Sequence, residues 1–214
     1  MKHEFLGDAL DHWKGSLIGQ LLGRGLVQDF AVDPMCTDPK LWNDDDVAAY
    51  ARLLHVERHQ IVSHTDKVDL AAKNRAAYFE ETMEKHHGDL FLDPDTGIYT
   101  GTRQPHAKHV TAKEIHGLLP DASKRLIMIY QHAAHAPMSE RVDEVTKVLQ
   151  EEIPSCAWAS YESATVAMLF VSLGQEGPRK VAEFFQEELG PRATERRIRA
   201  SHRQARQGTQ PGPV

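Results

Sequence analysis

Two aspartates that follow a short apolar run are the residues of this chain best suited to chemistry. Asp93 and Asp95 come directly after the run 90–92, and Pro94 and Gly97 favour a turn around them. An apolar run of this kind is typical of a strand buried on both faces of a parallel sheet, and such strands place ligand-binding groups just beyond their carboxyl ends. Two carboxylates at such a position can bind a divalent cation.

A second group of polar residues lies near the start of the chain, where Asp8, Asp11, His12 and Lys14 fall within about two helical turns. Lys14 is suited to neutralising a phosphate, and His12 can act as acid or base near neutral pH. The alternative is structural: Asp8 or Asp11 caps a helix, and the polar residues beside it serve no chemistry.

The carboxyl ends of parallel strands gather on one edge of a sheet, so these residues are expected to converge. The edge would also collect Thr37, Asp38 and His64, with His132 following a later strand. Clustered carboxylates repel one another unless a divalent cation or shifted pKa values relieve them. The predicted metal ligands are Asp8, Asp11, Asp93 and Asp95.

This pattern predicts a Mg²⁺- or Mn²⁺-dependent phosphoester hydrolase or nuclease-like enzyme that acts on a nucleotide or nucleic acid. Lys14 would bind a phosphate, and His132 or His12 would move the proton. The alternative for Asp93 and Asp95 is a plain turn in which both carboxylates cap backbone amides.

The elements that must position these residues follow from hydrophobic periodicity and capping signals. Expected strands cover 3–6, 29–35, 60–63, 90–92, 125–130, 156–162 and 166–172. Expected helices include 17–22, 43–54, 70–86, 111–119, 139–152 and 178–189. Asn43 caps the second of these helices, and Thr111 with Glu114 forms a capping box for the fourth.

Strands that alternate with helices predict an α/β fold, a Rossmann-like three-layer sandwich whose mostly parallel sheet ends in an antiparallel β-hairpin. Residues 1–190 are expected to form one domain, and residues 191–214 a basic, flexible tail. The two runs 156–162 and 166–172 are too close in sequence for a crossover, and they supply the hairpin.

This order of elements, with Asp93-Pro94 after the fourth expected strand, resembles the class I methyltransferases, whose sheet ends in such an antiparallel pair. In amino-methylating members an Asp-Pro-Pro-aromatic motif follows the fourth strand. The resemblance implies S-adenosylmethionine as the cofactor and Asp93 with Pro94 positioning an acceptor amine. The glycine-rich cofactor loop of the family is replaced by the sequence 7–12, and Asp33 or Asp38 would take the place of the acidic residue that binds the cofactor ribose.

Composition bounds the remaining functions. The chain has 214 residues, a net charge of -6 and only two cysteines, Cys36 and Cys156. No apolar stretch is long enough to span a bilayer, so we expect a cytoplasmic protein without membrane contact. Six arginines between Arg192 and Arg206 give this tail a charge of about +5, which could bind nucleic acid. A third alternative is therefore a non-catalytic module that binds nucleic acid or a partner.

Overall fold

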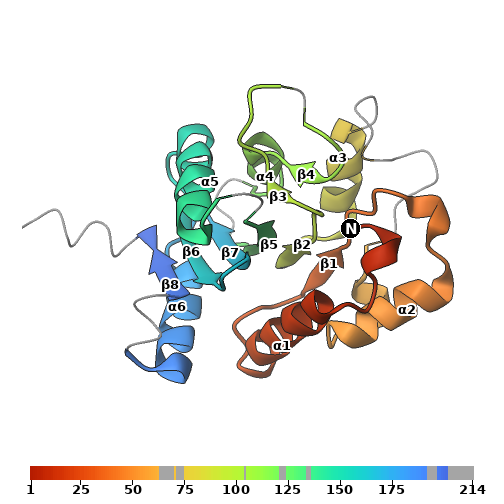
Figure 1. The fold of residues 1–214 in the computed structure, drawn as a ribbon, viewed down its shortest axis with the longest axis horizontal. Coiled ribbons are helices and arrows are strands. Elements are labelled where there is room, and N and C mark those ends of the chain that lie inside the picture. The colour runs from red at the N-terminus through yellow and green to blue at the C-terminus, as the bar shows by residue number, and fades with distance from the viewer. Residues whose placement is uncertain are drawn as a thin grey trace, which may run out of the picture.

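A six-stranded mixed sheet forms the centre of the structure, and helices cover both of its faces (Figure 1). The computed structural model describes residues 1–62, 70, 75–103, 105–120, 124–133, 136–191 and 197–201. The predicted three-layer α/β sandwich is thereby confirmed. In this described part of the chain, no helix is both long and apolar enough to cross a membrane.

The sheet has the strand order β1-β2-β5-β7-β6-β8. Its strands are β1 (Ala31–Asp33), β2 (Leu90–Leu92), β5 (Ile127–His132), β6 (Ala157–Glu162), β7 (Val166–Ser172) and β8 (Ile198–Ala200). The pairs β1-β2 and β2-β5 are parallel, whereas β7 runs antiparallel to both β5 and β6. Strands β1, β2, β5 and β6 therefore share one direction, and their carboxyl ends lie on one edge.

Two helical layers enclose this sheet (Figure 1). One layer holds α3 (Arg75–Lys85), α4 (Ala112–Gly117) and α5 (Met138–Glu152), and the other holds α1 (Ala9–Gly23), α2 (Asp44–Leu53) and α6 (Glu176–Leu189). Each layer has its own apolar core, because side chains alternate between the faces of a strand. In β2, Leu90 and Leu92 pack toward α3, α4 and α5, while Phe91 packs in the core of the other layer. The run 90–92 is apolar throughout because both of its faces are buried.

The capping signals in the sequence are present in the structure. Asn43 accepts hydrogen bonds from the backbone amides of Asp45 and Asp46 at the start of α2. Thr111 and Glu114 form the predicted capping box at the start of α4. The hairpin of β6 and β7 also forms as predicted.

The start of the chain differs from the expectation. The expected strand at 3–6 is a short 3-10 helix, η1 (His3–Phe5), so β1 is the first strand and α1 precedes it. The expected strand at 60–63 is reduced to a single parallel bridge between Ile61 and Val32, beside the 3-10 helix η3 (Arg58–Gln60). The residue types at both places favour a strand. The conformation of a segment of three or four residues, however, depends on whether the tertiary structure gives it a strand to pair with.

Several small elements were not expected. β3 (Gly97–Ile98) and β4 (His109–Val110) form a two-stranded parallel sheet, and η2 (Pro39–Leu41) follows β1. β8 lies in the segment expected to be a flexible tail, where Arg199 pairs with Glu162 of β6 at 2.6 Å and with Asp143 of α5. Buried Ile198 and Ala200 complete the attachment of this strand to the sheet.

Candidate functional site

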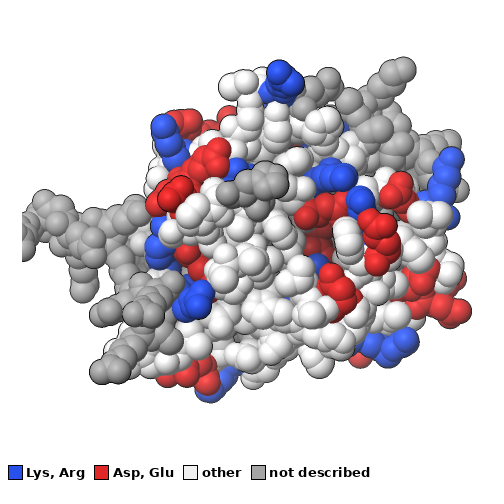
Figure 2. Space-filling model, viewed as in Figure 1, with Lys and Arg blue, Asp and Glu red and all other residues white. Residues whose placement is uncertain are grey.

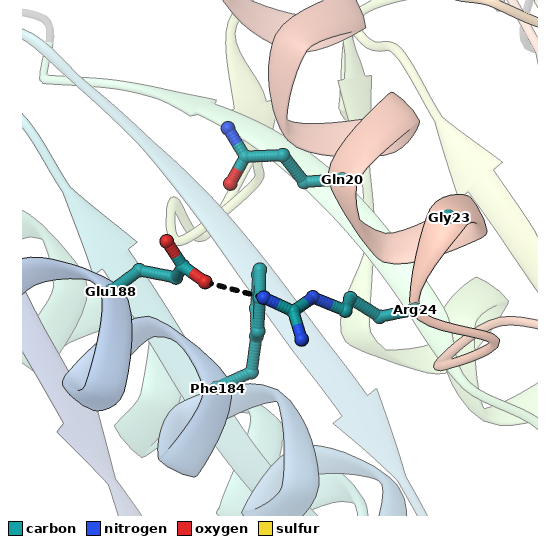
Figure 3. A pocket seen from close by; sticks show the side chains of 5 residues that line it. All are labelled: Gln20, Gly23, Arg24, Phe184 and Glu188. Carbon is teal, nitrogen blue, oxygen red and sulfur yellow. Dashed lines mark hydrogen bonds and ion pairs between the residues drawn. The ribbon is translucent and has the colours of Figure 1, made fainter.

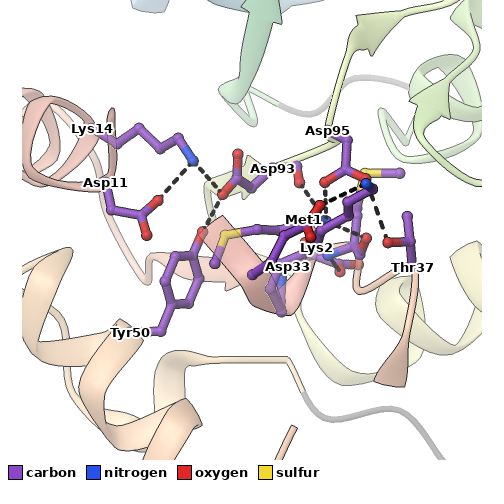
Figure 4. Close-up of polar contacts among 12 residues, drawn as sticks. Met1, Lys2, Asp11, Lys14, Asp33, Thr37, Tyr50, Asp93 and Asp95 are labelled. Atoms are coloured by element: carbon purple, nitrogen blue, oxygen red, sulfur yellow. Dashed lines mark hydrogen bonds and ion pairs between the residues drawn. The ribbon is translucent and has the colours of Figure 1, made fainter. Parts of the chain in front are cut away.

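A buried lysine joins the two acidic segments that the sequence predicts to converge. Lys14 Nζ lies 2.9 Å from Asp11 Oδ1 and 2.8 Å from Asp93 Oδ2 (Figure 4). Asp11 and Lys14 are one helical turn apart on α1, so their side chains share one face of this helix. Asp93 directly follows β2. All three residues are buried, with 1% of Asp11, 5% of Lys14 and 1% of Asp93 exposed.

The two oxygens of the Asp93 carboxylate have different surroundings. Oδ2 accepts hydrogen bonds from Lys14 and from the Tyr50 hydroxyl of α2, at 2.8 and 2.5 Å. Oδ1 is buried and has no hydrogen-bond partner among the described residues. A buried carboxylate oxygen without a donor is costly. This oxygen is therefore the atom of the site that is best prepared for a ligand.

Asp95 lies on the other side of the same turn. Its Oδ1 is 3.5 Å from the N-terminal ammonium of Met1, and its Oδ2 is 3.4 Å from the Thr37 hydroxyl. The Met1 ammonium also donates to the carbonyl oxygens of Pro34, Met35 and Asp93, at 2.7, 2.5 and 3.1 Å. The loops after β1 and β2 thus form a cradle of oxygen acceptors that holds one ammonium group (Figure 4).

The two loops begin with the same pair of residues: Asp33-Pro34 at the end of β1 and Asp93-Pro94 directly after β2. The amide of Asp93 donates to the carbonyl of Asp33 at 3.0 Å, which places the two turns side by side. Met35 has a φ of 46°, a left-handed conformation that is uncommon for a residue with a side chain. Such strain is found where the surroundings fix a loop, as the Met1 ammonium contact does here.

Gln131 of β5 fixes the far end of the turn that carries Asp93 and Asp95. Its amide accepts from the backbone of Ile98 at 2.8 Å and donates to the carbonyl of Thr96 at 3.0 Å. Gly97 has a φ of 111°, and a Cβ there would lie 2.3 Å from Gln131 Oε1. Glycine is required at this position by the conformation and by the approach of Gln131.

Burial and ion pairing set the charge of the Lys14 cluster. Burial raises the pKa of the Asp11 carboxyl, against the opposing effect of Lys14. Burial also disfavours the charge on Lys14, but the carboxylates of Asp93 and Asp11 outweigh it and raise the pKa of Lys14. The pKa of Tyr50 is raised by burial and by Asp93, so this hydroxyl stays protonated and donates a hydrogen bond to Asp93. Lys14 Nζ also lies 4.6 Å from the ring centre of Tyr130, a cation-π contact.

The structure brings some of the predicted site residues together and separates others. Asp11, Lys14, Asp93 and Asp95 lie around the ends of β1 and β2. Asp8 caps α1 through the backbone amides of Leu10 and Asp11.

The two predicted histidines take different positions. His12 is exposed on α1. His132 ends β5, next to β2, and is half-buried. His64 lies outside the described residues.

The carboxylates are a poor fit to a divalent cation. Both oxygens of Asp11 have donors, since Oδ2 accepts from the amide of Gly7 at 2.9 Å. Asp8 is a helix cap, and Asp95 faces an ammonium and a hydroxyl. Within the described ranges, no three side chains of the metal-ligating types are grouped so as to hold one ion. The repulsion among the carboxylates is instead relieved by the ammonium of Lys14.

Sequence reasoning predicted no site role for Tyr50, Tyr130 or the Met1 ammonium. Tyr50 stood on the expected apolar face of α2, and its hydroxyl was a signal, because a buried tyrosine usually finds a hydrogen-bond partner. Tyr130 was assigned only to a strand.

Asp33, considered for cofactor binding, is fully buried and accepts from the hydroxyls of Tyr78 and Thr82. Its oxygens therefore serve the packing of α3 against β1, and Oδ1 also fixes the loop after β1 by accepting from the amide of Met35 at 2.9 Å.

A surface pocket of about 380 Å³ lies elsewhere, between the end of α1 and α6 (Figure 3). It is lined by Gln20, Gly23, Arg24, Phe184 and Glu188. Because α1 begins beside Asp93 and ends here, the pocket is at the opposite end of this helix. It contains none of the predicted site residues.

The surface above the ends of β1 and β2 carries acidic and basic side chains side by side (Figure 2). A surface with both signs of charge does not favour an anionic over a cationic ligand. Comparisons with known proteins add no assignment: no family model, no curated protein and no solved structure is significantly similar to the chain. The geometry at the sheet edge is therefore the basis for a functional assignment.

Proposed function

We propose that the chain is a divergent enzyme of the class I methyltransferase type that methylates an amino nitrogen of a nucleotide or nucleic acid. One observation carries the proposal: the buried Asp93 carboxylate has one oxygen held by Lys14 and Tyr50 and one oxygen, Oδ1, without a donor. Such an oxygen is prepared to accept a hydrogen bond from an N–H group of a ligand. The resemblance of Asp93-Pro94 to the motif that positions an acceptor amine supports this role, and the motif follows β2, the second strand in the chain and not the fourth that the sequence predicted.

The ammonium cradle supports S-adenosylmethionine as the cofactor. The carbonyl oxygens of Pro34, Met35 and Asp93 receive the ammonium of a methionine, Met1, and the methionyl part of the cofactor carries the same group. The cofactor would replace Met1 in this cradle. When bound, it would supply the methyl group. The backbone carbonyls that converge here take the place of the glycine-rich loop of the family.

The residues of the chain have separate roles in this scheme. Asp93 Oδ1 would accept a hydrogen bond from the amino nitrogen and orient it, and Lys14 and Tyr50 would hold the carboxylate still. The nitrogen gains the methyl group and loses a proton. The cofactor ammonium would take the place of the Met1 ammonium beside Asp95, and Lys14 pairs with both Asp11 and Asp93, so one of these three carboxylate charges stays unbalanced. That charge suits a singly positive sulfonium better than a divalent ion.

Metal-dependent phosphoester hydrolysis stays a prediction of the sequence. Its physical premise was that clustered carboxylates need a cation, and Lys14 meets this need at Asp11 and Asp93. Hydrolysis would require the ion pairs to open before a metal could bind. We therefore favour methyl transfer.

Calorimetry of the full chain with S-adenosylmethionine, MgCl₂ and MnCl₂ tests the proposal. We expect a micromolar site for S-adenosylmethionine. Binding of a metal ion alone would overturn methyl transfer and favour the hydrolase. In Asp93→Asn the amide oxygen would face Lys14, and a donor would replace the acceptor Oδ1. Methyl transfer to nucleotides or nucleic acid should then fall by about 100-fold, with little change in cofactor affinity, whereas Asp45→Asn, at an exposed position of α2, should keep full activity.

The basic tail gives the proposal a nucleic-acid partner. Arg192, Arg196, Arg203 and Arg206 lie outside the described residues, while Arg199 is engaged in ion pairs that hold β8. Deletion of residues 202–214 leaves β8 intact, and it should weaken nucleic-acid binding and its dependence on salt. We place this enzyme in the cytoplasm, where two unpaired thiols are compatible with a reducing environment.

A further inference from the structure

A column of three aromatic rings stands beside the Lys14 cluster. The rings of Trp13 and Tyr161 are nearly parallel, with an angle of 10° and centroids 6.1 Å apart. The rings of Tyr161 and Phe185 continue the column, at 11° and 4.7 Å. Phe185 is buried, with 3% exposed, whereas Trp13 and Tyr161 are half-buried.

The column belongs to the same sheet edge as Asp93. Tyr161 is the penultimate residue of β6, which runs in the direction of β2 and β5. Met168 of β7 pairs with both Tyr161 and Tyr130, so these three residues form one row across the sheet. Trp13 covers one end of this row and its neighbour Lys14 covers the other, over the ring of Tyr130.

We propose that the ring of Trp13, at the end of this column and backed by Tyr161, is a stacking platform for the base of the substrate, a nucleobase that carries an exocyclic amine. A flat π-face is recognised by a ring already ordered by its neighbours, and Tyr161 is ordered by Phe185. The requirement for an amine rests on the proposed function, because Asp93 Oδ1 accepts only from a donor. Adenine and cytosine carry such an amine, and uracil does not.

Tryptophan fluorescence of the full chain tests the platform. Titration with AMP should quench the emission, whereas ribose 5-phosphate, which lacks a base, should not. A short single-stranded oligonucleotide forms the second arm, and tighter binding than AMP identifies a nucleic-acid strand as the source of the base. Equal or weaker binding identifies a free nucleotide.

Affinity measurements on variants locate the base. Trp13→Leu should weaken AMP binding by about 5- to 150-fold in equilibrium dialysis, the range for loss of one base–aromatic stack. Trp13→Phe keeps a ring and should retain most of the affinity, which keeps the test valid if Trp13→Leu does not fold. Phe5→Leu, which removes an aromatic ring that is 46% exposed, is the matched control and should bind AMP as the wild type does.

The outcomes separate the two proposals. Quenching by ribose 5-phosphate equal to that by AMP, or unchanged AMP affinity in Trp13→Leu, would overturn the platform. The amine is tested with N6,N6-dimethyl-AMP, whose exocyclic nitrogen carries no hydrogen. Binding as tight as that of AMP would leave the platform in place and overturn the role of Asp93 as an acceptor for an amine. Absence of S-adenosylmethionine binding would overturn methyl transfer alone.

Discussion

Replacement of Lys14 by methionine tests the ion-pair cluster directly. The side chain of Lys14 is 6% exposed, and its ammonium is the donor that Asp11 Oδ1 and Asp93 Oδ2 share. Methionine keeps most of the apolar stem and removes only the charge and its hydrogen bonds. Lys14→Met therefore leaves two buried carboxylates facing each other, with Tyr50 as the remaining side-chain donor to Asp93.

The expected cost follows from the burial of both partners. Removal of one member of a buried ion pair costs about 3–5 kcal/mol, because the other charge stays buried without compensation. Two carboxylates are left here, so we expect the free energy of unfolding to fall by about 4 kcal/mol at pH 7. Burial already raises the pKa of the Asp11 carboxyl beside Lys14, and without Lys14 this pKa rises further. A carboxyl whose pKa is higher in the folded than in the unfolded state favours folding when it is protonated. The loss of stability caused by Lys14→Met should therefore become smaller as the pH falls from 8 toward 4.

Urea unfolding followed by circular dichroism measures this cost. The matched control is Lys180→Met, which breaks an exposed pair with Glu176 at 2.7 Å and should leave the free energy of unfolding nearly unchanged. In the double variant Lys14→Met with Asp93→Asn, part of the lost stability should return, because a carboxamide needs no countercharge. A cost below about 1 kcal/mol for Lys14→Met, or a cost independent of pH, would refute the buried cluster.

Three further predictions follow from single contacts. Mg²⁺ or Mn²⁺ should raise the melting temperature of Lys14→Met but not of the wild type, because only the variant has two buried carboxylates without a cation; equal shifts would mean that Lys14 does not stand in for a metal. Gly15→Ala should destabilise the protein by more than about 2 kcal/mol in thermal denaturation, because a Cβ there would lie 1.9 Å from the Leu53 carbonyl oxygen. The control is Gly23→Ala in the same helix, where a Cβ meets nothing within 4 Å; this variant should be neutral or stabilising. Burial raises the pKa of the Cys36 thiol to about 12, so its alkylation by iodoacetamide at pH 8.5 should be on the order of 1,000-fold slower in the folded protein than in urea. Equal rates would contradict the raised pKa.

The sequence was sufficient for elements whose signals are local or periodic. The apolar runs of β2 and β5, the hairpin of β6 and β7, and the caps at Asn43 and Thr111 all lie close to their predicted positions. Each of these depends on residues that are neighbours in the chain. The fold class follows from them, because alternating strands and helices leave few arrangements of the layers.

The short elements that lack an apolar run of their own were beyond the reach of the sequence. η1 was expected as a strand, and β3, β4 and β8 were not expected at all. Short segments take their conformation from a partner, as β8 does from β6 and from the contacts of Arg199 with Glu162 and Asp143. A run of arginines alone indicates solubility or nucleic-acid binding and gives no sign of such pairing.

The meeting of Asp11, Lys14 and Asp93 was expected from topology, although the route was wrong. Lys14 reaches Asp93 from the first turns of α1, one helical turn after Asp11, and not from a loop after a strand. The role of Lys14 was also different from the expectation. It was assigned to a phosphate, whereas in the structure its charge is used within the protein.

Because Lys14 pairs with Asp11 and Asp93, it sets the charge that a ligand meets at this edge of the sheet. A pattern of acidic residues in a sequence indicates negative charge, but the charge that a ligand meets depends on cations that arrive from distant segments. Asp93 and Lys14 are 79 residues apart, and their contact turns a cluster suited to Mg²⁺ into a nearly balanced one. What remains is a single buried oxygen, Asp93 Oδ1, which a neutral N–H donor can satisfy without adding charge. The chemistry of this edge therefore depends on hydrogen bonding to one atom more than on the number of aspartates around it.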